Sequence, residues 1–525
     1  MRRLGRTLRD RGVQRRMGAA AVSGVLLALA FPAFDVGALA LVALVPLLWT
    51  WRDASPARAA LYGFTFGVVF AAILMYWLWY FGFVAIVPLV AAWAAYTALT
   101  GYLVGCLNRA GLRSGLGSAW LIAAAWVVPE ALRGRWPFGG LPWGDLGVAL
   151  HDFPPARALA SWGGVALVSF LLVVLNAYLL ELAIALRAHA RESIVAAMAG
   201  VGVIVAVVAI ADVARYETHP RGELRVAMLQ GNDQDRYLTT EEKRSGYLTE
   251  QHFALAGRLR GPYDLVVFPE SSLDDFSPES NPNLRRRLVA VGEEHGADVL
   301  ANAAVPAPDG REFNENLLYS PDGRLLGTYA KQHLVPFGEY VPFRSMVDWT
   351  GIVDRIPYDY SPGKVRTIFE VKGHRLATVI CFESAFGPLV RDFVDRGAEA
   401  VVVSTNNRSY RRSGNADQHI AQTQMRAAET GRPFLQASIS GISAVFDAGG
   451  DVRNTTDLFR RSVVSDTITT TNGKTPYVRF GEWVVVASAL LLIGAAVVSR
   501  VRRPRETFPR LAEEEREPVG SGRLT

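Results

Sequence analysis

Apolar positions form long runs in the first part of the chain and near its end, and only short runs in between. A helix needs about 20 mostly apolar residues to cross a bilayer, so the long runs predict about eight membrane spans. These spans lie at residues 18–34, 36–51, 61–81, 83–107, 117–133, 160–186, 194–213 and 482–499. The pattern therefore predicts a polytopic α-helical membrane domain at 18–213 and a single C-terminal transmembrane helix at 481–500.

Residues 214–480 have the composition of an ordinary globular domain, and their apolar runs are short. Buried-strand patterns end in "LVVFPE", "LATVIC" and "AVVVST", and the turn Pro321-Asp322-Gly323 predicts a hairpin. Helical segments separate the strands: "NLRRRLVAVGEEHG" is predicted to form a helix, and "EEKRSGYLTEQHFALAGRLR" has helical spacing. Strands that alternate with helices favour a layered α/β domain.

Arginines gather on one side of the predicted spans. They occur in residues 1–17, in the loops "WRDASPAR", "NRAGLRS" and "RAHARES", and in "SRVRRPR" after the last span. Because basic loops stay in the cytoplasm, we expect cytoplasmic termini and an extracytoplasmic 214–480 domain. The polar tail at 501–525 is predicted to be disordered. The net charge of +6 is modest. The arginines flank apolar runs instead of lining one face, which argues against nucleic-acid binding.

Three residues with complementary chemistry follow buried strands of the 214–480 domain. Glu270 ends "LVVFPE", Lys331 ends the predicted hairpin, and Cys381, one of only two cysteines in the chain, ends "LATVIC". A deprotonated thiol is a strong nucleophile, a carboxylate in an apolar pocket accepts its proton, and a lysine stabilises an oxyanion. Sites in α/β domains assemble at strand ends, so these residues predict an acyl-transfer site.

The motifs around these residues resemble a known superfamily. "FPE", "YAKQHLVPFGEYVP" and "ICFES" are similar to the Glu-Lys-Cys triad motifs of the nitrilase, or carbon-nitrogen hydrolase, superfamily, whose fold is an αββα sandwich. The apolar spans on both sides, together with "PEALRGRWPFGGLPWGDLG" at 129–147, resemble the apolipoprotein N-acyltransferase family. The resemblance covers about 15 to 500 of the chain.

The resemblance implies the last step of lipoprotein maturation in the bacterial cell (inner) membrane. Cys381 would take an acyl chain from a phospholipid, typically phosphatidylethanolamine, as a thioester. It would pass the chain to the N-terminal amine of diacylglyceryl-cysteine in an apolipoprotein. Glu270 would act as base and acid, Lys331 would hold the oxyanion, and Glu339 and Glu383 would orient Lys331 or the thiol. Structural ion-pair roles for Glu339 and Glu383 are equally compatible with the sequence.

The chain departs from the family pattern at two positions next to these motifs. Phe382 follows the cysteine where many members have tyrosine, and Ser409 stands where many have tryptophan. Both departures bear on the shape of the acyl pocket. No spacing typical of a metal or nucleotide site is present in the sequence, so neither a metal nor another cofactor is expected.

The long connection at 344–363 carries a second hypothesis. Its large apolar residues, among them Trp349 and Ile352, suggest a mobile lid that dips into the bilayer surface and admits acyl chains. The alternative is an ordinary packed Ω-loop.

Two other functions remain open at this point. A membrane-anchored nitrilase-type amidase would share the three residues but release the acyl group to water. A non-catalytic lipid- or lipoprotein-binding scaffold would not use them. Anchoring needs only one span, so eight predicted spans favour a membrane part that binds substrate.

Overall fold

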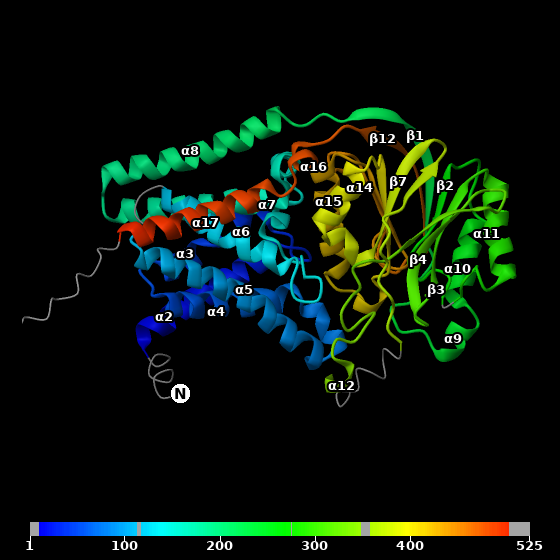
Figure 1. Cartoon of the computed structure of the whole chain (residues 1–525), viewed down its shortest axis with the longest axis horizontal. Coiled ribbons are helices and arrows are strands. Elements are labelled where there is room, and N and C mark those ends of the chain that lie inside the picture. Colours follow the sequence, from blue (N-terminus) through cyan, green and yellow to red (C-terminus); the bar gives the residue numbers. More distant parts are fainter. Residues whose placement is uncertain (1–9, 113–116, 275, 348–357, 503–525) are drawn as a thin grey trace, which may run out of the picture.

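Two structurally different parts pack side by side in the computed structural model, which describes residues 10–112, 117–274, 276–347 and 358–502 (Figure 1). The helices at one end form a bundle of long apolar elements, and two β-sheets with their own helices form the other end. The bundle contains α2 (Arg11–Leu29), η1 (Gly37–Leu41), α3 (Val45–Trp51), α4 (Pro56–Leu74), η2 (Tyr76–Phe81), α5 (Phe83–Arg109), α6 (Gly117–Arg133), η3 (Leu146–Leu150), α7 (Pro154–Arg187), α8 (Arg191–Val213) and α17 (Trp483–Arg502).

Five helices within the described residues are long and apolar enough to cross a membrane, namely α4, α5, α7, α8 and α17. Of the other predicted spans, 117–133 coincides with α6, whereas 18–34 and 36–51 contain helix with different bounds. The run at 36–51 is divided between η1 and the short α3. Helix α2 begins in the basic N-terminal segment because Asp10 caps it, its carboxylate accepting a hydrogen bond from the amide of Gly12. The count of eight spans stays a prediction.

The predicted span at 160–186 lies within α7, which runs from Pro154 to Arg187 and is apolar enough to cross a membrane. Helix α7 is interrupted at Gly163 and Gly164, and Gly164 has a φ of +72°, which glycine adopts without steric cost. The interruption leaves the amide of Val165 without a helical acceptor, and the carboxylate of Glu429 from the α/β part accepts its hydrogen bond at 2.5 Å. A long-range contact, which apolar periodicity does not encode, therefore fixes the break.

Two six-stranded sheets face each other in the α/β part. The first has the order β12-β1-β2-β3-β4-β5 and the second β11-β10-β9-β8-β7-β6. Their strands are β1 (His219–Gln230), β2 (Leu265–Phe268), β3 (Asp298–Pro306), β4 (Glu312–Tyr319), β5 (Leu325–Ala330), β6 (Ile368–Val371), β7 (His374–Ile380), β8 (Ala400–Thr405), β9 (Phe434–Ser438), β10 (Ala444–Phe446), β11 (Val452–Thr455) and β12 (Ser462–Asn472). Apolar side chains of both sheets, such as Val226, Val267 and Val401, fill the space between them.

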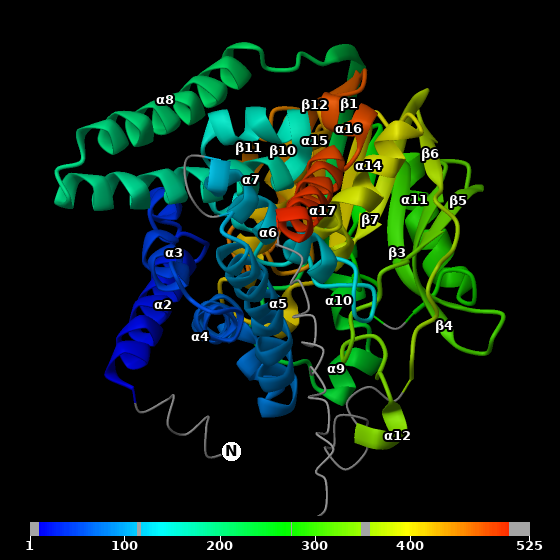
Figure 2. The ribbon, with the colours of Figure 1, turned by 60° about the vertical axis from the view of Figure 1, so that its left-hand side comes forward.

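Helices cover both outer faces of this pair of sheets and complete the predicted αββα sandwich (Figures 1 and 2). One layer contains α9 (Thr240–Arg244), α10 (Tyr247–Ala256) and α11 (Pro282–His295), and the other α14 (Gly387–Asp395), α15 (Asn415–Thr430) and the short α16 (Pro476–Phe480). The segment with helical spacing around 241–260 forms two helices, because Gly246 turns the chain with a φ of +71°. Helix α15 is buried between the sandwich and the membrane bundle, where it contacts α7.

Candidate functional site

Cys381 lies at the turn where β7 ends and the 3-10 helix η5 (Cys381–Ala385) begins. Its φ of +53° is unusual for a residue other than glycine and costs about 1–3 kcal/mol, a strain typical of functional turns. Burial raises the pKa of the thiol to about 12, helped by the charge of Glu270 and opposed by Lys331 and by hydrogen bonds from Thr405 and the Asn406 amide. The resting thiol is therefore protonated and needs a base when it reacts.

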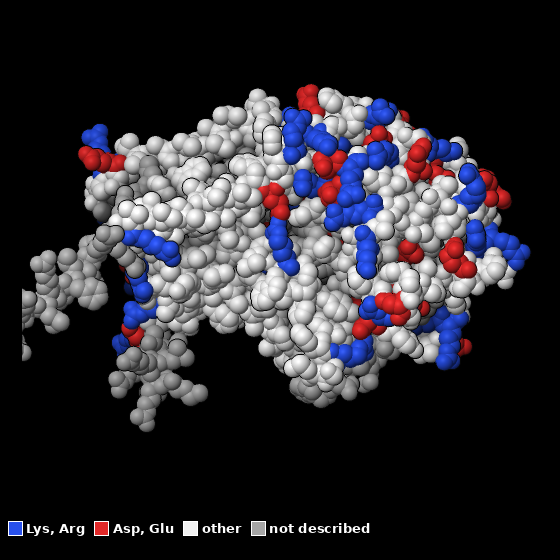
Figure 3. Space-filling model, viewed as in Figure 1, with Lys and Arg blue, Asp and Glu red and all other residues white. Residues whose placement is uncertain are grey.

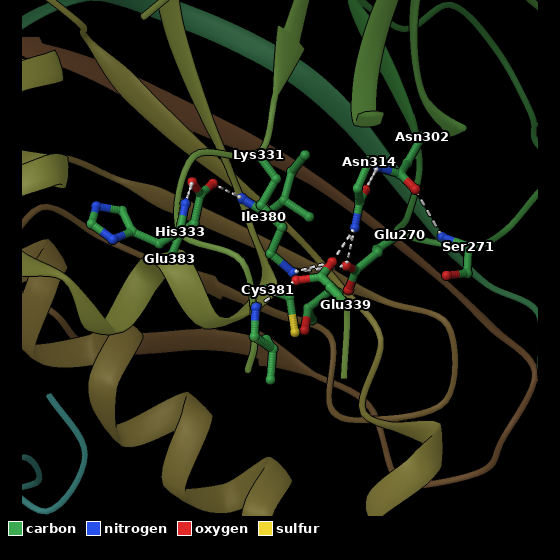
Figure 4. A network of polar contacts seen from close by, with 12 residues as sticks. Glu270, Ser271, Asn302, Asn314, Lys331, His333, Glu339, Ile380, Cys381 and Glu383 are labelled. Atoms are coloured by element: carbon green, nitrogen blue, oxygen red, sulfur yellow. Dashed lines mark hydrogen bonds and ion pairs between the residues drawn. The ribbon is translucent and has the colours of Figure 1, made fainter. Parts of the chain in front are cut away.

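Lys331 follows β5 and is almost fully buried, with an exposed fraction of 1%. Its Nζ lies 2.9 Å from Oε1 of Glu339 and 3.3 Å from Oε1 of Glu270. Burial disfavours the ammonium charge, but the two carboxylates and Cys381 outweigh burial and raise the pKa of Lys331 well above its usual value. Figure 4 shows the ammonium pointing between these carboxylates, with the sulfur of Cys381 beside them. A permanent positive charge next to the thiol is thus built into the fold.

Glu270 follows β2, and the two oxygens of its carboxyl group have different surroundings. Oε1 accepts a hydrogen bond from Nδ2 of Asn314 at 2.8 Å and pairs with Lys331. Among the residues that the structure describes, none donates a hydrogen bond to the buried Oε2. Burial raises the pKa of Glu270, and the charge of Glu339 adds to this effect, against the opposing influence of Lys331 and Asn314. Such a carboxyl group is suited to accept and return a proton.

Glu383 is fully buried on the other side of Lys331 and has a different environment. Its carboxylate accepts hydrogen bonds from the hydroxyl of Tyr329 at 3.0 Å and from the amides of Gln332 at 2.7 Å, His333 at 3.1 Å and Ile380 at 2.8 Å. These donors flank Lys331 on one segment and Cys381 on another. Glu383 therefore joins the two segments through their backbones, and neither the Lys331 ammonium nor the thiol is among its hydrogen-bond donors.

Two cavities meet at Cys381. The first has a volume of about 260 Å³, is almost entirely apolar, and is walled by membrane-bundle residues such as Trp77, Trp93 and Trp143. The second has a volume of about 730 Å³, is more polar, and contains Glu270, Lys331 and Glu339. An acyl chain matches the first cavity, and polar reactants match the second. The thiol is accessible from both.

Two family models match consecutive parts of the chain. Residues 23–178 match the apolipoprotein N-acyltransferase N-terminal domain, and residues 225–477 match the carbon-nitrogen hydrolase domain. The apolipoprotein N-acyltransferase of Methylococcus capsulatus is 32% identical over 511 residues, which cover 94% of this chain and 98% of that protein. This chain belongs to the apolipoprotein N-acyltransferase family.

Other members of the family match along the same length. The apolipoprotein N-acyltransferase of Nitrosomonas europaea is 31% identical and covers 94% of this chain and 98% of its own. The protein of the same name from Geobacter metallireducens is 29% identical and covers 93% of this chain and 95% of its own. Because the similarity includes the membrane part, it supports an acyltransferase over an anchored amidase or a non-catalytic scaffold.

Sequence reasoning missed a row of asparagines that supports the site of this family member. Nδ2 of Asn302 donates to Oδ1 of Asn314 at 2.8 Å and to Oδ1 of Asn316 at 3.0 Å. Nδ2 of Asn314 in turn bridges Glu270 and Glu339, at 2.8 Å from each. The available signal was the alternation of "NEN" at 314–316, which places two asparagines on the inner face of a buried strand.

The remaining predicted residues differ in how far the structure describes them. Glu339 contacts Lys331 directly, and its Oε2 also accepts the amide of Val335 at 2.8 Å. Phe382 lines the apolar cavity and Ser409 the polar one, so both departures from the family pattern lie at the site. Trp349 and Ile352 of the suggested lid lie outside the described residues, and the lid stays a prediction.

Proposed function

We propose that this protein transfers an acyl chain from a phospholipid to the N-terminal amine of a diacylglyceryl-cysteine apolipoprotein, with Cys381 as the carrier. The observation that carries the proposal is the position of Cys381 between an apolar cavity walled by the membrane bundle and a polar cavity that holds Glu270, Lys331 and Glu339. One cavity has the chemistry of an acyl chain, and the other has the chemistry of ester and amine groups.

In the first half-reaction the thiol attacks the ester carbonyl of the phospholipid, with phosphatidylethanolamine as the proposed donor. Oε2 of Glu270 accepts the thiol proton as the carbon–sulfur bond forms, and the Lys331 ammonium stabilises the oxyanion. The tetrahedral intermediate then expels the glycerol oxygen, which takes the proton from Glu270. The products are an acyl thioester on Cys381 and a lysophospholipid.

In the second half-reaction the amine of the apolipoprotein attacks the thioester from the polar cavity. Glu270 accepts a proton from the amine, Lys331 again holds the oxyanion, and the carbon–sulfur bond breaks. The proton returns to the sulfur, so the enzyme regains its starting state and the net products are an amide and a lysophospholipid. The protein uses the same thiol, carboxyl and ammonium in both halves, which corresponds to a ping-pong mechanism.

For the arrangement in the membrane we propose eight spans, formed by α2–α8 with η1 extending α3, and by α17. Residues 18–213 would form the membrane domain, 214–480 the extracytoplasmic catalytic domain and 481–500 the last span, with 1–17 and 501–525 cytoplasmic. Figure 3 supports this arrangement, because Lys and Arg gather at the outer end of the bundle and on the α/β part, with a largely uncharged band between them.

The test uses the full-length protein in lipid nanodiscs that contain phosphatidylethanolamine with an isotope-labelled acyl chain. We expect mass spectrometry to find the labelled acyl group on Cys381, and to find a triacylated product after a diacylated lipopeptide is added. Cys381→Ala should yield neither species. Labelled fatty acid without lipopeptide acylation would identify a hydrolase, and full transfer by Cys381→Ala would overturn the proposal.

A further inference from the structure

Three buried tryptophans wall the apolar cavity, and hydrogen bonds fix the orientation of each indole. Nε1 of Trp93 donates to the carbonyl oxygen of Trp143 at 3.1 Å. Nε1 of Trp143 and Nε1 of Trp77 both donate to Oε1 of Gln418, at 2.8 and 3.0 Å. Gln418 is not part of the cavity wall itself, but it is the common acceptor behind two of the three indoles.

The amide of Gln418 is buried and fully used. Its Nε2 donates to the carbonyl oxygen of Pro32 at 2.7 Å and to that of Leu74 at 2.9 Å. Leu74 is the last residue of α4, where carbonyl groups have no helical donor. Because an indole N–H only donates and a carbonyl only accepts, the orientation of the amide is unambiguous. One side chain of the catalytic domain thus satisfies four groups of the membrane bundle.

The same turn of α15 also supports the nucleophile. Nε2 of His419, the residue after Gln418, lies 3.1 Å from the carbonyl oxygen of Cys381 and 2.7 Å from the hydroxyl of Ser384. The His419 ring lies in the wall of the apolar cavity, 6.1 Å from that of Trp143. Helix α15 therefore sets the position of the indole walls relative to the thiol that would receive the acyl carbonyl.

We propose that Gln418 is a specificity-determining residue, which sets the preference for acyl-chain length by holding the indoles of Trp77 and Trp143 in one orientation. The proposal rests on the proposed acyl transfer to Cys381. Walls that are close-packed and fixed discriminate between chains that differ by one or two methylenes, whereas walls that reorient do not. Without the Gln418 oxygen, two buried indole N–H groups lose their acceptor and must turn toward another one.

The experiment measures acylation of Cys381 in the full-length enzyme by phosphatidylethanolamines whose acyl chains differ by two carbons at a time. For the unsubstituted enzyme we expect about a tenfold rate difference between the preferred chain and its neighbours, as small hydrophobic pockets provide. In Gln418→Met, which keeps the length of the side chain but has no hydrogen-bonding amide, this difference should fall to about threefold or less. Gln418→Glu keeps an oxygen facing the indoles, and its protonated carboxyl still donates to one of the two carbonyls, so most of the difference should be retained.

The matched control is Gln424→Met on the same helix. Gln424 is also buried at the interface, and its Oε1 lies 2.7 Å from Nδ1 of His151, but it does not line the cavity. The Gln424→Met variant should leave the dependence of the acylation rate on acyl-chain length unchanged. If Gln418→Met does not fold, Trp143→Phe removes one indole donor and should broaden the profile. A uniform loss of rate with an unchanged profile in these variants, or equal broadening in Gln424→Met, would overturn the proposal. Absence of any acyl adduct on unsubstituted Cys381 would instead overturn the proposed function.

Discussion

Glu270 and Glu383 are both buried glutamates near Lys331, yet their environments differ in the number of donors they contain. Glu383 accepts hydrogen bonds from a hydroxyl and three backbone amides, so both of its oxygens are committed. Glu270 shares Oε1 with Asn314 and Lys331, and its Oε2 has no hydrogen-bond donor among the described residues. The contrast indicates that a committed carboxylate fixes the backbone, whereas a free oxygen beside a thiol is available for a proton.

The largest expected effect is on the acylation rate, which should depend strongly on Glu270. Glu270→Gln removes the proton acceptor but keeps the shape of the side chain, so acylation of Cys381 should slow by about 10²–10⁴-fold. The thermal unfolding midpoint should change little, because the buried Lys331 keeps its ion pair with Glu339 at 2.9 Å. Glu315→Gln, a nearby buried carboxyl on β4, is the control and should retain the rate. A near-normal acylation rate in Glu270→Gln would show that Glu270 does not act as the base and does not differ from Glu383 in this respect.

The next effect concerns Lys331, whose ammonium pairs with Glu270 and Glu339 and, within the described residues, not with Glu383. Lys331→Met should lower the acylation rate by about 10²–10³-fold, the typical loss when one oxyanion donor is removed. The measurement is single-turnover formation of the acyl enzyme, with Lys474→Met as the control, since Lys474 pairs with Asp395 at the surface. Equal losses in both variants would show that the charge of Lys331 has no special role.

A smaller effect should appear in stability at Glu383. In Glu383→Gln an NH₂ group replaces one acceptor oxygen, so at least one buried donor loses its partner at a cost of about 1–3 kcal/mol. We expect a lower thermal unfolding midpoint, and a similar but weaker change in Tyr329→Phe, which removes one donor to Glu383. An unchanged midpoint in both variants would contradict the structural role assigned to Glu383.

The smallest effect is a shift in pH dependence. Because the pKa of Glu270 is raised, mainly by burial, the base form is lost as the pH falls through a value above that of an ordinary glutamate, about 4.3. As the pH is lowered, the acylation rate should therefore begin to fall while the pH is still above about 4.3. The same fall in rate at low pH should appear in Tyr329→Phe and should be absent from Glu270→Gln. If the acylation rate were halved only at or below about pH 4.3, the loss of rate would not be due to protonation of Glu270.

Sequence reasoning predicted local features better than long-range ones. Glu270, Lys331 and Cys381 were predicted because each follows a buried strand or hairpin with a recognisable motif, and the structure places them around one cavity. The interruption of α7 at Gly164 and the asparagines behind Glu270 were missed. Their partners lie far away in the chain, as with Val165 and Glu429, so no local pattern contains them.

The sequence by itself determined the apolar runs, the alternation of strands and helices, and the three candidate site residues, because these depend on side-chain type and on short-range periodicity. Only the tertiary structure decided which oxygen of Glu270 has no donor within the described residues, which carboxylate fixes the backbone, and that Gln418 of α15 accepts hydrogen bonds from two indoles of the bundle. Hydrogen bonds between distant segments depend on where those segments meet, and their meeting point is a property of the packed fold.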